Sequence, residues 1–457
     1  MGKLALTLAF FAAGLNFVAL KLGDAFGGKA PLLYAVAMGV PAVTLGAASW
    51  WSVASFARSR LIVACALIAV AGMFYATEPE NHRGFVGLSY ILMTLPIAAL
   101  IVENRCWWLC AKVYVYANAL ALSLALYFEY WVHGITMLGD LHRLGFLRSS
   151  DGAYRLANPN VVGGQLAFAS VLAFIMYLKA GSSQSEARKA AVGLQKFSLA
   201  WTLFLSLGCI LTASRGAFVA WLGGMGPLLF WGTRSQKSYK VRDLVGFGTV
   251  LALLMLFASI AVGFTPWGSL QGRFDSQKEI VTGSGRTLIW KYAFDTWRTN
   301  PQYWLVGTGT GTAPEALGRH LGLTQGDGYT PAALDAHNAF VEWGLSFGLF
   351  GAATGICMLV TVCRRARHMD RRDGTINRQV ILLCFCLTSM NYVTFYQQFF
   401  VAAGALILSS LSAPSPIGQA RLSRPEPADS LSATGQHRRR PRLIRHAPLS
   451  DPVSQES

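Results

Sequence analysis

Charged side chains are scarce in this chain of 457 residues, where Asp, Glu, Lys and Arg together make up 13%. A soluble domain usually carries about 25% charged residues, so an ordinary soluble fold is disfavoured. The chain also lacks the paired Cys-x-x-Cys spacing of zinc sites, and most of its eight cysteines fall in apolar stretches. We therefore expect no zinc site of this kind and no disulfide framework, and nothing in the sequence indicates a cofactor.

Long apolar runs stand where charge is missing, and hydrophobic residues make up 53% of the chain. A membrane-spanning helix needs roughly 20 mostly apolar residues. The sequence predicts an all-α integral membrane protein with about twelve transmembrane helices. The predicted spans are 4–22, 31–51, 61–76, 84–102, 107–127, 160–179, 197–213, 216–232, 244–265, 338–362, 379–395 and 398–413.

The net charge of +17 would suit a nucleic-acid-binding protein, but its distribution does not. Lys and Arg gather in alternate short loops, such as 188–196, 234–242 and 364–378, and in the tail around 438–445. This asymmetry is the positive-inside signal of membrane topology. It predicts a multi-pass membrane protein with both termini in the cytoplasm and no nucleic-acid partner.

The topology leaves two long segments outside, 128–159 and 266–337. The second follows the ninth span and is too long for a simple connector. We expect a membrane domain over 1–413 that includes this loop. The tail 414–457 is rich in Pro, Ser and Arg, which predicts a disordered basic cytoplasmic segment beside the membrane lipids.

The long outer loop is expected to contain helices. In residues 286–299, Ile289, Ala293 and Trp297 recur every four residues and form one apolar stripe. Asn300-Pro301 ends this predicted helix. A second short helix is expected from Pro314.

Two arginines at the outer face are candidate anion-binding residues. Arg215 sits in the short turn between two apolar spans, where it either snorkels to lipid headgroups or clamps an anion. Arg286 opens the predicted loop helix after Ser284, a residue type that caps helices. Guanidinium groups bind phosphate bidentately, so both arginines suit a phosphate ligand.

His337 lies where the outer loop re-enters the membrane, next to Asn338. A single His is more often structural, but this one shares its membrane face with both arginines. A neutral imidazole there can take a proton from a hydroxyl group.

Two polar or glycine-rich stretches complete the candidates. Asn158-Pro159-Asn160 opens the sixth span from outside, where capping and substrate contact are equally consistent with the sequence. The glycine-rich run 304–311 is not a dinucleotide-binding fingerprint, because no βαβ unit surrounds it. Its glycines indicate a tight turn or close backbone packing, and direct phosphate contact is the less favoured alternative.

Five motifs in order resemble one family. ANPNVVGGQLAF, LTASRGAFVAWL, SGRTLIWKYAFDTWRTNP, WLVGTGTGT and AHNAFVEWGLSFGLFG are similar to the O-antigen ligases and the O-antigen and exopolysaccharide polymerases. The resemblance covers about 158–351. It implies a fold like that of the GT-C membrane glycosyltransferases and a metal-independent transfer of glycan from undecaprenyl diphosphate on the periplasmic side. The implied acceptor is lipid A–core for a ligase, or a growing polysaccharide for a polymerase.

The resemblance also implies roles for individual residues. Arg215 and Arg286 match the diphosphate-binding arginines, and His337 matches the histidine that activates the acceptor hydroxyl. Arg273 resembles an arginine that lies earlier in the outer loop of family members. Positions that line the pocket or support it match Trp290, Gly307, Gly309 and Asn338.

One position departs from the family pattern. Relatives often carry an acid shortly before the glycine that matches Gly348, and here Ser346 stands there, with Glu342 nearby. Which acid orients His337 is therefore open.

Other readings stay open as well. Ligase and polymerase share motifs and donor. Two other classes are a twelve-span secondary transporter, which the 70-residue outer loop disfavours, and a non-catalytic partner in envelope assembly.

Overall fold

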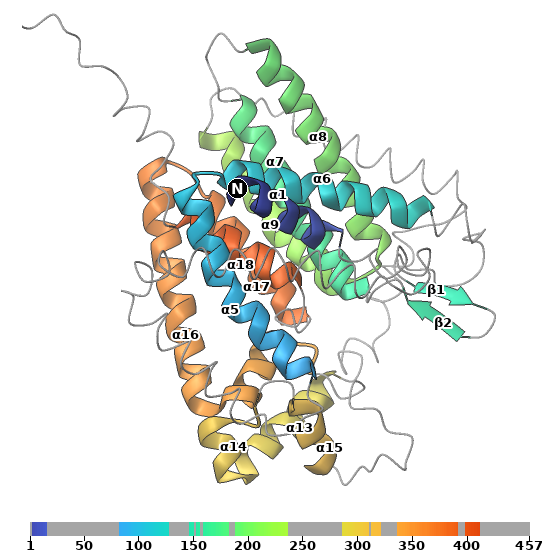
Figure 1. Cartoon of the computed structure of the whole chain (residues 1–457), viewed down its shortest axis with the longest axis vertical. Helices are drawn as coiled ribbons and strands as arrows, with labels where there is room; N and C mark the ends of the chain where they lie inside the picture. Colours follow the sequence, from blue (N-terminus) through green and yellow to red (C-terminus); the bar gives the residue numbers. More distant parts are fainter. Residues whose placement is uncertain are drawn as a thin grey trace, which may run out of the picture. The chain divides into compact units, whose positions relative to one another are not determined.

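Figure 1 shows the computed structural model of the chain. It describes residues 2–15, 82–127, 146–149, 152–155, 159–181, 188–235, 286–309, 312–320, 336–391 and 398–411. All of these belong to one unit, residues 1–413. The predicted tail and the predicted spans 31–51, 61–76 and 244–265 lie outside the described residues.

The long helices of this unit coincide with predicted spans. They are α1 (Gly2–Gly14), α5 (His82–Glu103), α6 (Trp107–Leu126), α7 (Pro159–Gly181), α8 (Arg188–Leu211), α9 (Arg215–Ser235), α16 (Ala339–Asp373), α17 (Asn377–Asn391) and α18 (Gln398–Ser410). By length and composition, three described helices can cross a membrane: α6, α7 and α16. The total of twelve spans stays a prediction.

Helices are present in the described part of the segment 266–337, which we call the outer loop after its predicted topology. Helix α13 (Arg286–Thr299) has the predicted bounds, and α15 (Ala313–His320) lies where the second short helix was expected. Between them the structure adds α14 (Pro301–Val306), which we did not predict. The Oδ1 atom of Asn300 accepts hydrogen bonds from the N–H groups of Gln302 at 3.1 Å and Tyr303 at 3.5 Å. Asn300-Pro301 therefore ends one helix and caps the next.

The segment 128–159 contains a short hairpin that we did not predict. Strands β1 (Phe146–Ser149) and β2 (Gly152–Arg155) form an antiparallel hairpin there, with Phe146 opposite Arg155 and Ser149 opposite Gly152. Four residues per strand give too little alternation to detect in a sequence.

Helix α7 forms the core of the bundle. It packs against α6, α8, α9 and α17, and nearly all of its residues are buried. A helix that is apolar on every side is typical of a protein core or of a membrane span, and α7 has the burial of a core helix. Small residues allow those neighbours to approach closely: a Cβ added at Gly164 would lie 2.3 Å from Cγ2 of Thr388 on α17.

A buried amide connects three helices near the end of α1. The Nε2 atom of Gln165 donates to the carbonyl oxygens of Ala13 and Gly14, both at 3.1 Å, and to Oδ1 of Asn118 at 2.9 Å. Gln165 lies on α7 and Asn118 on α6. Such polar contacts substitute for the hydrophobic effect, which gives little drive for helix association in lipid.

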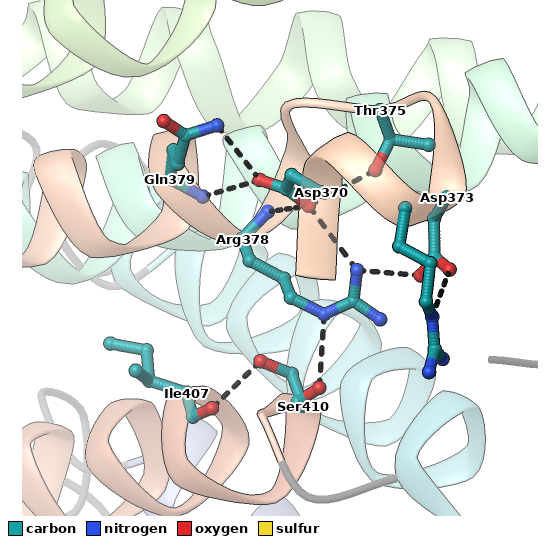
Figure 2. Close-up of polar contacts among 8 residues, drawn as sticks. Asp370, Asp373, Thr375, Arg378, Gln379, Ile407 and Ser410 are labelled. Atoms are coloured by element: carbon teal, nitrogen blue, oxygen red, sulfur yellow. Dashed lines mark hydrogen bonds and ion pairs between the residues drawn. The ribbon is translucent and has the colours of Figure 1, made fainter. Parts of the chain in front are cut away.

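The ends of α16, α17 and α18 meet at a buried carboxylate. Asp370 has no exposed surface, and its carboxylate accepts from Thr375 Oγ1 at 3.0 Å, from Arg378 Nη1 at 3.2 Å and from Gln379 N at 2.9 Å (Figure 2). A buried carboxylate is tolerated only when it is paired and hydrogen-bonded in this way.

Arg378 links this carboxylate to α18. Its Nε donates to the carbonyl oxygen of Ser410 at 3.0 Å, and its Nη1 lies 2.8 Å from Asp373 Oδ2 (Figure 2). Arg365 of α16 donates to the carbonyl oxygen of Leu411 at 3.0 Å. Two arginines thus satisfy the last carbonyls of α18, which no residue within that helix can reach.

The Asp370 cluster should dominate the stability of this end of the bundle. Replacing Asp370→Ala removes the acceptor that Thr375, Arg378 and Gln379 share and should lower the free energy of unfolding by about 3 kcal/mol. Thermal unfolding of the purified protein measures this loss. Asp295→Ala is the matched control, because its pair with Arg298 is exposed and 3.9 Å long, and it should leave stability unchanged. Equal stability of the two variants would contradict this account.

Candidate functional site

The turn between α8 and α9 places Arg215 at the first residue of α9. Ala213 in this turn has φ of 46°, a left-handed conformation uncommon for a residue with a side chain. Thr212 steadies the turn: its Oγ1 donates to the carbonyl oxygen of Cys209 at 2.6 Å and accepts from the N–H of Ser214 at 3.4 Å. The turn is buried, whereas Arg215 is partly exposed.

Ser214 joins this turn to the start of α7. Its Oγ accepts from the N–H of Ala217 at 3.4 Å, which is the N-cap interaction of α9. The same hydroxyl donates to Oδ1 of Asn160 at 2.7 Å. Asn160 accepts this hydrogen bond, and Arg215 directly follows Ser214 in the chain. Two residues singled out from the sequence are therefore brought close to each other.

The start of α16 has a similar construction around His337. His337 has φ of 49°, again left-handed, and it directly precedes the N-cap residue Asn338. The Oδ1 atom of Asn338 accepts from the N–H groups of Phe340 at 2.9 Å and Val341 at 3.3 Å. The side-chain oxygen of Asn338 thus caps the start of α16. The strained backbone conformation falls on His337, which is a candidate functional residue.

Trp290 ties the outer loop to the His337 turn. Its indole Nε1 donates to the carbonyl oxygen of Ala336 at 2.7 Å. Arg286 begins α13, four residues before Trp290, so the two residues share one helix face. The Trp290 contact therefore joins the helix that begins at Arg286 to the His337 turn.

The glycine-rich run docks on a break in α16. Gly348 has φ of 62° and ψ of −158°, which interrupts the helix and the hydrogen bonds that should cross it. The N–H of Thr308 donates to the carbonyl oxygen of Leu345 at 2.8 Å, and the N–H of Gly309 donates to that of Ser346 at 3.0 Å. The glycine-rich run thus supplies N–H donors to the two carbonyl groups that lose their helical partners at the break. The predicted close backbone packing is therefore confirmed.

Glycine is required on both sides of this contact. A Cβ at Gly307, where φ is 83°, would lie 2.3 Å from the carbonyl carbon of Ser346. A Cβ at Gly348 would lie 2.5 Å from the carbonyl carbon of Leu305. Backbone atoms cannot move aside as side chains do, so any larger residue would separate the two segments.

Apolar contacts complete the attachment of the outer loop. Ala293 of α13, Ala313 of α15 and Leu345 of α16 form a small buried cluster, flanked by Trp297 and Val341. Figure 1 shows α13, α14 and α15 gathered around the start of α16, in agreement with their contacts. The loop helices are thus packed where His337 enters the bundle.

The buried acid in the first turns of α16 is Glu342. It has no exposed surface, and its N–H donates to the carbonyl oxygen of Asn338 at 3.0 Å. Ser346, at the position where relatives carry an acid, is also fully buried, and its Oγ has no hydrogen-bond partner among the described residues. Glu342 is therefore the acid that the described part of α16 places nearest to His337 along the chain.

Comparison with known families identifies this region. Residues 200–356 match the family model described as O-antigen ligase. This part of the chain is an O-antigen ligase domain. No curated protein matches the chain.

The matched range of the O-antigen ligase domain begins in α8 and ends in α16. It contains Arg215, Arg286 and His337, and it also contains the docked glycine run. Members of this family are glycosyltransferase-like enzymes that act on lipid-linked glycans and polysaccharides, with either ligase-like or polymerase-like activity. The apolar helices and the family match together indicate that the chain is a membrane protein.

The described contacts assemble the candidate residues of the O-antigen ligase domain in two groups. Asn160 and Arg215 form one, around the Ser214 hydroxyl. Trp290, His337 and Asn338 form the other, around the start of α16, and Arg286 begins the helix α13 that carries Trp290. Asn158 and Arg273 lie outside the described residues. Among the residues that the structure describes, no group of three His, Cys, Asp or Glu side chains could hold a metal ion.

Sequence reasoning gave no separate role to Ser214 or Thr308. Both are small hydroxyl residues inside recognised motifs, and their partners lie 54 and 37 positions away. A Ser directly before a predicted helix was an available capping signal for Ser214. Nothing in the sequence around Thr308 indicated that its N–H group would bind a carbonyl group at a break in another helix.

Gly348 should be indispensable for docking of the outer loop. Gly348→Ala places a Cβ against the backbone of Leu305 at a positive φ and should cost about 1–3 kcal/mol. We expect faster hydrogen exchange at the Thr308 and Gly309 amides. Gly344→Ala is the control on the same helix, since a Cβ there meets nothing within 4 Å. Unchanged exchange in Gly348→Ala would refute the docking role.

Proposed function

We propose that this protein transfers a glycan from undecaprenyl diphosphate to a hydroxyl of lipid A–core, as an O-antigen ligase. The observation that carries the proposal is that an O-antigen ligase domain holds Arg215 and His337 at two strained, side-chain-capped helix starts. Backbone strain of this kind persists where the surrounding structure fixes it, and it is common at functional sites.

In the proposed reaction the arginines stabilise the leaving group. Breaking the bond between sugar and diphosphate leaves negative charge on the diphosphate. The guanidinium groups of Arg215 and Arg286 bind that charge, so the proposed mechanism needs no metal ion.

His337 is the proposed general base of the same reaction. It takes the proton of the acceptor hydroxyl as the oxygen attacks the anomeric carbon from the side opposite the diphosphate. A single displacement of this kind inverts the configuration at that carbon. Glu342, buried in the first turns of α16, is the proposed acid that orients the imidazole.

The arrangement of helix ends supports a site on the periplasmic face. Helix α17 begins beside Asp370 and runs for 15 residues, about 22 Å at 1.5 Å per residue. Near its far end Thr388 packs against Gly164, one turn from Asn160. Helix α16 likewise leads from Asp370 back to His337. The basic Asp370 end is the proposed cytoplasmic face, and the site residues lie at the opposite ends of these helices.

A polymerase that joins repeat units is the second candidate, because the family includes both activities. The two share donor and chemistry and differ in the acceptor. The candidate residues serve either reaction equally.

Transfer by the purified protein tests the proposed site residues. With lipid-linked donor and lipid A–core acceptor, Arg215→Ala and His337→Ala should each lower the transfer rate at least about 100-fold, because each removes charge stabilisation or proton transfer. Arg298→Ala is the control, because this arginine is 81% exposed on the loop helix α13. Variants at Arg215 or His337 that keep normal rates would exclude the mechanism.

Deletion of the protein distinguishes the candidate acceptors. Loss of all long-chain lipopolysaccharide on gels, together with accumulated lipid-linked polymer, is the expected result for a ligase. A single repeat unit on lipid A–core would mean a polymerase, and intact lipopolysaccharide with missing secreted polysaccharide would mean an exopolysaccharide enzyme. Uptake or export of a solute by the protein in proteoliposomes, without covalent transfer, would indicate a transporter instead.

A further inference from the structure

We infer that Asn160 is a positioning residue for Arg215, which holds the start of α9 against α7 through the hydroxyl of Ser214. The inference rests on the proposed function, in which Arg215 binds the donor diphosphate. It gives Asn160 a role that is distinct from contact with sugar, although both roles fit its place at the mouth of α7.

The Ser214 hydroxyl can make both of its contacts only in one orientation. A hydroxyl has a single proton, and that proton goes to Asn160 Oδ1 at 2.7 Å. An oxygen lone pair is then left to accept the N–H of Ala217 at 3.4 Å. The Asn160 contact therefore orients the group that caps the helix begun by Arg215.

The two segments also approach each other closely at Gly163, which has no side chain. A Cβ added at Gly163 of α7 would lie 2.6 Å from Thr212 Oγ1 and 2.6 Å from Ala217 Cβ. The left-handed Ala213 between them leaves the turn little freedom to adjust. The Asn160 side chain is thus the polar end of a tight interface, and its loss should shift the start of α9.

Arg215 is the next residue after Ser214, so a shift of the cap moves its Cα directly. Binding and reaction depend steeply on placement, and a displacement of about 1 Å in a positioned group can cost 100-fold in rate. An intact Arg215 in a displaced turn would therefore bind diphosphate less well.

The decisive measurement is the affinity of the full-length protein in lipid nanodiscs for undecaprenyl diphosphate, a probe that carries no sugar. Asn160→Ala should weaken binding about fivefold, the size expected for one lost interhelical hydrogen bond in a membrane protein. In the Ser214→Ala background the same change should have no further effect, because its partner is already gone. In the Ser214→Thr background, which keeps the hydroxyl, the fivefold effect should return.

The matched control is Ser206→Ala. Ser206 Oγ accepts from the indole Nε1 of Trp221 at 2.9 Å, so this variant also removes a buried hydrogen bond between α8 and α9. It should lower the melting temperature as much as Asn160→Ala does and leave the affinity for the probe unchanged.

Each other outcome overturns the inference in an identifiable way. A fivefold loss from Asn160→Ala in both backgrounds would mean direct contact with the diphosphate. No loss in the wild-type background would mean that Asn160 does not support Arg215. Equal loss of affinity in Ser206→Ala would mean general loosening of the bundle. Wild-type protein that fails to bind the probe would instead overturn the proposed donor, and the inference with it.

Discussion

A membrane protein must satisfy its own backbone, because hydrocarbon offers no hydrogen bonds to a group that leaves a helix. Helix α16 meets that demand at its break. Where α16 breaks at Gly348, the amides of Thr308 and Gly309 reach the carbonyls of Leu345 and Ser346. The docking of the outer loop and the placement of His337 both depend on this repair. The loop docks at the carbonyl groups that the break exposes, and the break needs the N–H groups of the loop to satisfy those carbonyls.

The same demand explains why the two candidate helices begin alike. In each, a left-handed residue turns the chain and the next residue caps the helix: Ala213 with Ser214, and His337 with Asn338. The cap satisfies N–H groups that would otherwise be buried without partners. A left-handed residue with a side chain is unfavourable by itself, so packing of the neighbouring segments must hold it. Trp290 supplies such a contact beside His337, and Gly163 allows one beside Ala213.

Local patterns in the sequence were sufficient for the helices but not for the links between them. Apolar runs predicted α7 and α9, and the four-residue spacing of Ile289, Ala293 and Trp297 predicted α13. Each of these signals lies within one element. The hairpin at Phe146 was missed because its strands are short, and α14 was missed because Asn300-Pro301 both ends and begins a helix.

The site was predictable as residue types and not as contacts. Arg215 and His337 were singled out by their places at predicted span ends and then matched to family motifs. The link from Asn160 to Ser214, by contrast, spans 54 positions and the link from Trp290 to Ala336 spans 46. Tertiary packing decides such pairs. For Asn338, whose amide oxygen could equally face a ligand or a helix start, only the structure assigns the oxygen to the backbone of α16.

Helix α16 connects the two chemically distinct ends of the bundle. Its first residues carry the His337 turn and its last residues carry Asp370, whose five donors come from the turn into α17 and from the first residues of that helix. A carboxylate this well satisfied resists displacement, since moving any donor would expose charge to a medium that cannot solvate it. Anchoring one end of α16 so firmly leaves the break at Gly348 as the place where its direction is set. The segment 339–347 then takes its orientation from the outer loop and not from the rest of α16. By this reasoning, loop contacts such as that of Trp290 with Ala336, more than the span itself, determine where the imidazole of His337 is held.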